Sequence, residues 1–267
     1  MTDKLKIAVI GSGAGLLQLV IAGGLEVVLR KSDLGRQTEP VAAGLATVDH
    51  YEDFLAAIEH PRLFLLDMAP GPEIDALIDE AYVFMEPGDV VIDPSGSYWC
   101  DTLRRFRRMR HRSLFYVDIA LIRPPGPTVT LLSGDRRGVE LALPVAERLG
   151  APAAAVIAGE AGAAHFALMV RDTLQAALAH AASEARQLLE AYPNEMDADA
   201  VGAALSLEES EPGPRAAWAL DDAVRLQAVV PMMAQAVMLE LGAALDEHRQ
   251  APIPPRLGPF VHPDDIL

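Results

Sequence analysis

The sequence predicts an α/β protein in which a doubly wound parallel β-sheet over residues 1–153 precedes an all-α region over residues 154–267. Short apolar runs alternate with helical stretches of roughly ten residues through the first half. A glycine-rich turn directly follows the first apolar run, and only helical patterns occur beyond residue 159. Together these observations indicate two domains with different architectures.

The apolar runs of the first half are rich in β-branched residues, as buried parallel strands are. They predict strands at residues 6–10, 25–30, 62–68, 89–95, 114–122 and 128–134. The segments between them predict helices at residues 16–24, 51–60, 72–85, 102–112 and 139–150. The basic segment 102–112 spaces its arginines with Leu, Phe and Met, which indicates a helix that covers the sheet rather than a nucleic-acid surface.

The second half predicts a long, Ala-rich helix over residues 161–192, a short one within 193–205, and two more at 216–229 and 231–248. Apolar residues surround most of the long helix. We therefore expect it to pack against other helices or against a second subunit. The Pro-rich tail, residues 249–267, is expected to be extended.

Composition limits the classes of function and of binding partner that the chain can have. The formal charge of -16 disfavours binding to nucleic acid or to an anionic membrane. The single cysteine permits no internal disulfide, and no signal peptide or transmembrane pattern is recognised, so we expect a cytoplasmic protein. The seven histidines show no zinc-ligand spacing, so no metal site is expected.

The glycine-rich turn predicts a Rossmann-type dinucleotide site. Gly11, Gly13 and Gly15 follow a strand and open a helix, where backbone N–H groups can approach a pyrophosphate. The usual GxGxxG spacing would place the third glycine at position 16, which is Leu16. A structural turn without a ligand is therefore the alternative interpretation.

The end of the second strand bears on the choice of cofactor. NAD-binding enzymes usually carry an acidic residue there, which binds the ribose hydroxyls. This chain instead has Arg30, Lys31 and Ser32, which suit a 2′-phosphate and favour NADP. The alternative is that these are ordinary surface cations.

Three segments carry a family resemblance. The segment "VIDPSGSYWCDTLRR" resembles the "IDGGNSYYKDTIRR" region of 6-phosphogluconate dehydrogenases, within the β-hydroxyacid dehydrogenase superfamily. "GEAGAAHFALMVRDTLQ" resembles the family's "GPAGAGHFVKMVHNGIE" segment, and "EPGPRAAWALDDAVRLQAVVPMMAQAVM" resembles a late helical segment. The three follow one another in the family's order and span most of the chain.

The resemblance implies an N-terminal domain that binds NAD(P) and a helical C-terminal domain that forms a homodimer and completes the active site. The cofactor site would comprise Gly11, Ser12, Gly13, Ala14, Gly15, Arg30, Lys31, Ser32, Met68, Ala69, Pro70 and Ser95. The family's acid–base pair is a lysine and a glutamate on the long helix. This chain has Leu168 and Gln175 at those positions, and neither side chain can exchange a proton in this way.

Other positions also depart from the family pattern. The nicotinamide-side asparagine becomes Gly96, and the Ser-Gly-Gly loop falls on Ile122, Arg123 and Pro124. The pattern excludes oxidative decarboxylation of 6-phosphogluconate, because that reaction needs a base and an acid.

Two titratable residues near Leu168 are candidates for a new proton donor. Asp172 lies one helical turn beyond Leu168, and His165 lies three residues before it. Imine reductases share this fold and lack the lysine. The alternatives are that Asp172 pairs with Arg171 or another cation and that His165 is a packed residue at the helix start.

The predicted substrate contacts are Ser97, Tyr98, Arg123 and Arg171. The favoured function is a divergent NADP(H)-dependent oxidoreductase acting on a small polar substrate. The alternatives are a non-redox enzyme of specialised metabolism or a ligand-binding dimer that has lost the cofactor site, or a structural partner of another enzyme.

Overall fold

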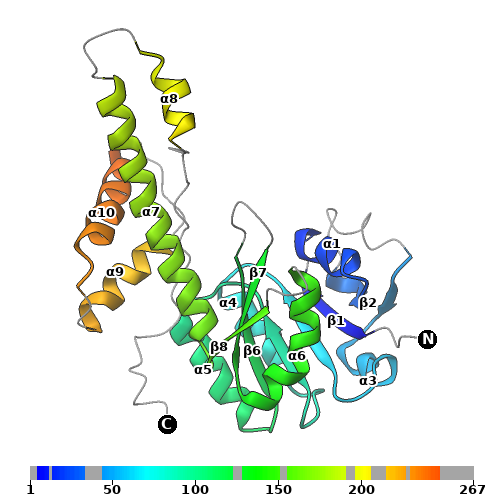
Figure 1. The fold of residues 1–267 in the computed structure, drawn as a ribbon. Helices are drawn as coiled ribbons and strands as arrows, with labels where there is room; N and C mark the ends of the chain where they lie inside the picture. The colour runs from blue at the N-terminus through cyan, green and yellow to red at the C-terminus, as the bar shows by residue number, and fades with distance from the viewer. Residues whose placement is uncertain are drawn as a thin grey trace. The chain divides into compact units, whose positions relative to one another are not determined.

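A computed structural model describes residues 5–11, 14–33, 44–122, 128–150, 155–190, 196–205, 215–226 and 229–246. Its strands are β1 (Lys6–Gly11), β2 (Glu26–Arg30), β3 (Ala46–Val48), β4 (Leu63–Asp67), β5 (Val90–Asp93), β6 (Phe115–Ile122), β7 (Val129–Gly134) and β8 (Ala155–Gly159). Its helices are α1 (Ala14–Ala22), α3 (Phe54–Ala57), α4 (Pro72–Ala81), α5 (Trp99–Arg110), α6 (Arg136–Leu149), α7 (Ala163–Glu190), α8 (Ala198–Ala204), α9 (Ala216–Arg225) and α10 (Pro231–Asp246). These elements confirm the predicted α/β class (Figure 1).

The strands form one sheet in the order β3-β2-β1-β4-β5-β6-β7-β8. Neighbouring strands are parallel except for β6 and β7, which pair antiparallel from Val117↔Gly134 to Ile122↔Val129. Only residues 123–128 connect these two strands, and a parallel crossover needs a dozen residues or more. The expectation of a parallel sheet therefore holds on both sides of this one antiparallel pair.

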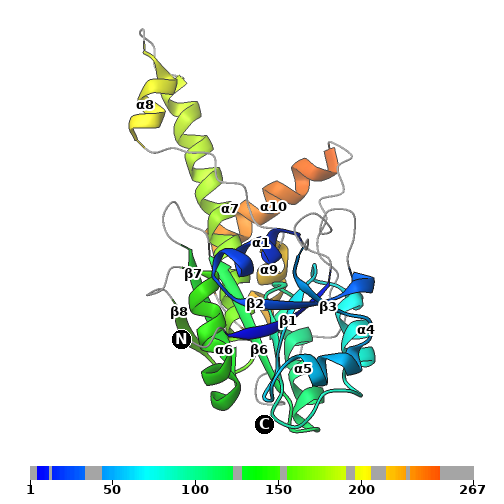
Figure 2. The ribbon, with the colours of Figure 1, turned by 90° about the vertical axis from the view of Figure 1, so that its right-hand side faces the viewer.

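Helices cover both faces of the sheet, which makes the fold doubly wound (Figure 2). On one face, Leu17 of α1 and Val139 of α6 join the side chains of Val9 and Leu65 in a buried cluster. The cluster on the other face gathers side chains from α3, α4 and α5, among them Phe54, Ile74, Leu77, Phe106 and Met109. The basic helix α5 is thus a sheet-covering helix, as predicted.

The chain divides into two compact units, and the boundary for the described residues falls between Ala167 and Leu168, within α7. The second unit is helical. Its small core joins Ala176 and Ala177 of α7 to Ala216 of α9 and to Ala236 and Val237 of α10. Among the described residues, no helix has the length and apolar character needed to cross a bilayer.

The sequence analysis missed two strands. β3 has only three residues, and β8 lies just beyond the predicted boundary at residue 153, so the sheet continues past that point. The helix predicted over 51–60 is also shorter than expected. It consists of a 3₁₀ turn at Tyr51–Asp53 and of α3, which ends at the extended residue Ile58. The predicted tail, residues 249–267, lies outside the described residues.

Candidate functional site

The turn after β1 is built around Gly11, which has a φ of 112°. A Cβ atom there would lie 2.4 Å from the Asp67 carbonyl oxygen and 2.6 Å from Cγ of Met68, so only glycine fits. The helix that follows, α1, ends at the turn of Gly23 and Gly24, as predicted. A Cβ atom on Gly15 would meet no heavy atom of the other described residues within 4 Å, so these residues leave open space beside the first turn of α1.

The predicted cofactor residues near this turn are described unevenly. Ser12 and Gly13 lie outside the described residues, as does the side chain of Ala14. After β4, Met68 and Pro70 are partly buried and Ala69 is exposed.

The cations at the end of β2 are already paired. Arg30 donates to Asp33 from Nε (2.8 Å) and Nη2 (2.6 Å) and to Glu80 from Nη1 (2.8 Å). Its guanidinium also lies 3.9 Å from the ring centroid of Tyr51. Lys31 pairs with Asp49 at 2.8 Å, and Ser32 is exposed.

Asp33 is a site residue that the sequence analysis missed. Its Oδ2 accepts a hydrogen bond from the Gly11 backbone N–H at 3.3 Å, so the carboxylate lies beside the glycine turn. It follows Gly11 by 22 residues, which is close to the spacing of the ribose-binding acid in NAD sites. This spacing is a sequence signal for Asp33, but the prediction named only Arg30, Lys31 and Ser32.

A second missed carboxyl group belongs to Asp67, the last residue of β4. In the sheet register Asp67 is paired with Gly11. Burial raises the pKa of Asp67 to about 6, while a backbone hydrogen bond with Leu17 acts in the opposite direction. Leu17 belongs to the first turns of α1, so this carboxyl group lies at the start of that helix.

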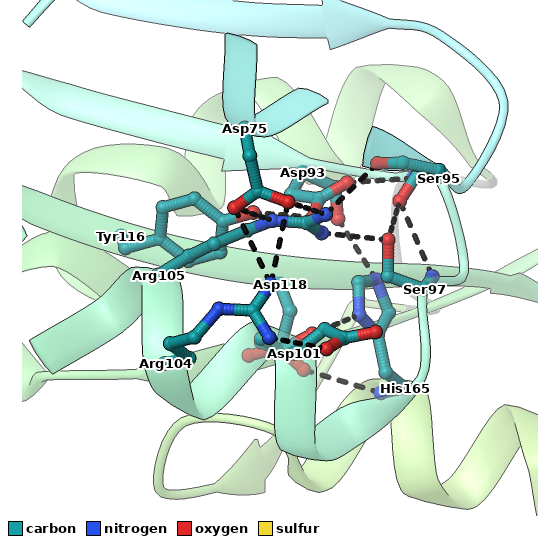
Figure 3. Close-up of polar contacts among 12 residues, drawn as sticks. Asp75, Asp93, Ser95, Ser97, Asp101, Arg104, Arg105, Tyr116, Asp118 and His165 are labelled. Atoms are coloured by element: carbon teal, nitrogen blue, oxygen red, sulfur yellow. Dashed lines mark hydrogen bonds and ion pairs between the residues drawn. The ribbon is translucent and has the colours of Figure 1, made fainter. Parts of the chain in front are cut away.

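A buried polar network lies at the carboxyl end of β5 (Figure 3). Tyr116 donates from its hydroxyl to Asp93 at 2.5 Å, and Arg105 lies 3.7 Å from the same carboxylate. Burial alone would raise the pKa of Asp93, but His165 and Arg105, with hydrogen bonds from Ser95 and Tyr116, lower it below its ordinary value. This carboxyl group therefore remains an anion.

The predicted contacts Ser95, Ser97 and Tyr98 belong to this interior. Their side chains are buried, and Ser95 and Ser97 share a hydrogen bond of 2.7 Å between hydroxyls. Arg105 donates to Ser97 from Nη1 at 2.8 Å and forms an ion pair with Asp75 at 2.9 Å. Ser97 and Tyr98 are thus buried in this structure, and their contact with a substrate stays a prediction. Arg123 lies outside the described residues.

The start of α7 is held by the buried carboxylate of Asp118, on β6. Its Oδ1 accepts from the Gly162 N–H at 2.8 Å, and its Oδ2 accepts from the His165 N–H at 3.1 Å and from the Ser133 hydroxyl at 2.6 Å. Ser133 in turn accepts from the Ala164 N–H at 2.8 Å. Asp118 and Ser133 therefore satisfy three N–H groups that the helix itself leaves free.

His165 is 1 % exposed, and both ring nitrogens have partners. Nε2 lies 3.1 Å from the carbonyl oxygen of Asp93, and a carbonyl can only accept, so Nε2 donates. Nδ1 forms a hydrogen bond of 2.7 Å with the Thr102 hydroxyl. The geometry gives this ring a positioning role, which was the alternative interpretation of His165, and its catalytic role stays a prediction.

In the second unit, Asp172 is 4 % exposed and lies between two cations. Its Oδ2 accepts from Arg215 Nη1 at 3.1 Å, and its Oδ1 lies 3.7 Å from Arg171 Nη1. Asp172 is therefore within ion-pair distance of both arginines. Leu168, one turn earlier, is buried and apolar.

Comparison with known proteins agrees with this fold and turn. Residues 6–162 match the family model of the NAD-binding domain of 6-phosphogluconate dehydrogenase, which is more than half of the chain. The chain therefore belongs to the 6-phosphogluconate dehydrogenase family, and a nicotinamide dinucleotide-binding domain of that family spans its first unit almost to the end.

Individual relatives are distant. The decarboxylating 6-phosphogluconate dehydrogenase of Bacillus licheniformis is 29% identical over 154 residues, which is 54% of this chain but 33% of that enzyme. The chain thus matches only about a third of that relative's length.

Among solved structures, 3-hydroxyisobutyrate dehydrogenase of Mycobacterium tuberculosis has a TM-score of 0.72 and 17% identity, covering 91% of this chain and 95% of that one. For 6-phosphogluconate dehydrogenase of Plasmodium falciparum, the TM-score is 0.68 at 13% identity, covering 97% and 67%. At these identities the likeness is one of fold.

Replacing Asp118 by alanine should destabilise the first unit by at least about 3 kcal/mol, because it leaves several buried donors without an acceptor. Urea denaturation of the two proteins measures the difference. Asp135→Ala is the matched control, since Asp135 stands at the N-cap of α6 but forms no side-chain capping bond there. Its cost should stay within about 0.5 kcal/mol, and equal costs for the two variants would show that Asp118 does not anchor α7.

Proposed function

We propose that the chain is an NADP(H)-dependent oxidoreductase that acts on a small polar substrate and does not decarboxylate 6-phosphogluconate. The observation that carries the proposal is the β1–Gly11–α1 turn, with its positive φ at Gly11 and the open space beside Gly15. A nicotinamide cofactor would supply or accept a hydride. The turn would bind its pyrophosphate through backbone N–H groups.

Two cations support NADP as the cofactor. Arg30 and Lys31 each pair with a carboxylate that is more than half exposed, Glu80 and Asp49 respectively. Exposed pairs of this kind contribute little, so the doubly charged 2′-phosphate can replace these carboxylates. Ser32 offers a hydroxyl at the same place.

A different contact favours NAD. Asp33 is well buried, is tied to Arg30 and lies against the first glycine of the turn. A carboxylate there can accept hydrogen bonds from both ribose hydroxyls, whereas it repels a phosphate. The two cofactors therefore make opposite demands on Asp33.

Replacing Asp33 by asparagine tests the choice between these cofactors. Under the NADP proposal, Asp33→Asn releases Arg30, and the Kd for NADPH should fall about three- to tenfold. The fluorescence of bound NADPH and NADH measures both affinities. Asp79→Asn is the control, because Asp79 on α4 forms an exposed ion pair with Arg108 on α5. Weaker NADH binding with no gain for NADPH would establish NAD as the cofactor, and no binding of either by any of the proteins would contradict the oxidoreductase proposal.

The proton chemistry must come from residues other than those of the family. Leu168 and Gln175 occupy the positions of its base and acid, so we propose Asp172 as the proton donor, with Arg171 beside it. Burial of Asp172 supports this role. Its contact with Arg215 opposes it, because a carboxylate has to leave its cations before it carries a proton.

Asp172→Asn should lower kcat for reduction about 10²- to 10⁴-fold with little change in KM. Oxidation of NADPH in the presence of small polar carbonyl and imine compounds provides the assay. Asp221→Asn, which alters an exposed ion pair with Arg225 on α9, should leave kcat unchanged. If Asp172→Asn keeps the full rate, Asp172 is only an ion-pair partner.

We also propose that the helical unit forms a homodimer. Val170, Leu174 and Leu178 are 38%, 47% and 51% exposed, and their spacing of four residues places them on one face of α7. Such an exposed apolar ridge on a long helix is typical of a subunit interface.

Replacing Leu174 and Leu178 together by arginine should convert the dimer into a monomer, because two desolvated charges would be placed in the interface. Light scattering after size exclusion measures the mass. Leu55→Arg is the matched control, since Leu55 is a similarly exposed leucine on α3 of the first unit. A monomeric wild-type protein would contradict the proposal.

The main alternative is a non-redox protein that keeps the fold without the cofactor. The feature that favours it is acidity at the turn, since Asp33 and Asp67 both lie beside Gly11. Carboxylates at that place oppose the binding of a pyrophosphate.

A further inference from the structure

Asp67 lies where the fold brings two strands and a helix together. It ends β4, it is paired with Gly11 at the end of β1, and its carbonyl oxygen would touch a Cβ at Gly11. Side chains alternate along a strand, and Leu63 and Leu65 both face the cluster that includes Leu17 and Val20 of α1. The Asp67 side chain points to that same face, toward the start of α1.

Asp67 has a backbone hydrogen bond at the start of α1, but α1 carries no cation that would balance a negative charge. The residue is 7 % exposed, and its carboxyl group has a backbone hydrogen bond with Leu17. No titratable side chain occurs in α1 or in the part of β1 between Ile7 and Gly11. Burial accordingly raises the pKa of the carboxyl group to about 6.

The charged groups on the other packed elements point elsewhere. Asp93 ends the neighbouring strand β5, but its carboxylate faces Tyr116 and Arg105 on the opposite side of the sheet. The charged residues of α6 are all exposed. Asp33 contacts the same turn through the Gly11 N–H, and Arg30 holds it as an ion pair.

A dinucleotide would bring two negative phosphates to the same helix start. An ionised Asp67 would repel them, whereas a protonated Asp67 would remove that repulsion and provide an O–H donor for a phosphate oxygen. We propose that Asp67 is a specificity-determining residue of the cofactor site, and that a dinucleotide binds the protein together with one proton, which resides on the Asp67 carboxyl group. This inference rests on the proposed function, because it requires that a dinucleotide binds at the turn.

The proposal predicts a pH dependence of binding with a definite sign. Below pH 6 the carboxyl group is already protonated, and the Kd should be constant. Above pH 6 each molecule that binds must take up a proton, so the Kd should rise by up to about tenfold per pH unit. Asp67→Asn should remove this rise and give the tighter binding at pH 8, because an amide is neutral at every pH.

The experiment titrates wild-type protein, Asp67→Asn and the control Asp135→Asn with NADH and NADPH between about pH 5.5 and 8.5. The 2′-phosphate of NADPH titrates in the same range, with a pKa near 6, so the difference between wild type and Asp67→Asn isolates Asp67. Calorimetry in two buffers of different ionisation enthalpy measures how many protons the wild-type protein and Asp67→Asn each take up when the cofactor binds. At pH 7 we expect close to one proton per NADH, or per NADPH after subtracting the value for Asp67→Asn.

The outcomes separate this inference from the proposed function. Binding whose pH dependence is the same in wild type and Asp67→Asn, without proton uptake attributable to Asp67, would overturn the role of Asp67 and leave the oxidoreductase proposal standing. Binding by Asp67→Asn but not by wild type at any pH would show that Asp67 blocks the site, which also overturns proton-coupled binding. No binding by any of the three proteins would overturn both proposals.

Discussion

The carboxylate of Asp118 fixes the point at which the sheet ends and the long helix begins. It is fully buried on β6, and it accepts hydrogen bonds from two backbone N–H groups of the segment that opens α7 and from Ser133 on β7. An anion at a helix N-terminus is favourable because it meets free N–H groups and the positive end of the helix dipole. The antiparallel pairing of β6 and β7 brings Asp118 opposite Ser133, so one hydrogen-bonded group anchors two strands and a helix.

The placement of His165 follows from this anchor. Because Asp118 holds the first turn of α7, the imidazole ring is directed at Thr102 of α5 and at the Asp93 carbonyl at the end of β5. The ring thereby connects the start of α7 to helix α5 and to the end of strand β5. These contacts give His165 a positioning role, and its predicted role as an acid stays a prediction.

Most of the sheet could be predicted from the sequence, whereas the site could not. Runs such as those around Val9, Leu65 and Ile92 are apolar on both faces and therefore mark buried parallel strands clearly. β3 and β8 are short strands at the two edges of the sheet. They depend on pairing with neighbours distant in sequence, so the local sequence pattern does not predict them.

The site depends on contacts that no local pattern records. Arg30 looked available for a phosphate, but Glu80 approaches it from a position 50 residues later in the chain. Arg105 was one of many arginines on a basic helix, and only the fold shows that it is buried beside Asp93. The spacing of 22 residues between Gly11 and Asp33 is visible in the sequence, but the direction of the Asp33 side chain is not.

Three aspartates on adjacent strands show how the same side chain acquires different chemistry from its surroundings. Asp93 is buried beside Arg105 and Tyr116, and these neighbours hold its pKa below the ordinary value despite burial. Asp118 is just as buried, but its carboxylate meets N–H and O–H donors. Asp67 has a single backbone hydrogen bond and no paired cation among the described residues, so burial dominates and its pKa rises to about 6. The surroundings of Asp67 therefore allow this carboxyl group to gain and lose a proton close to neutral pH, and it lies at the turn where we propose that an anionic ligand binds.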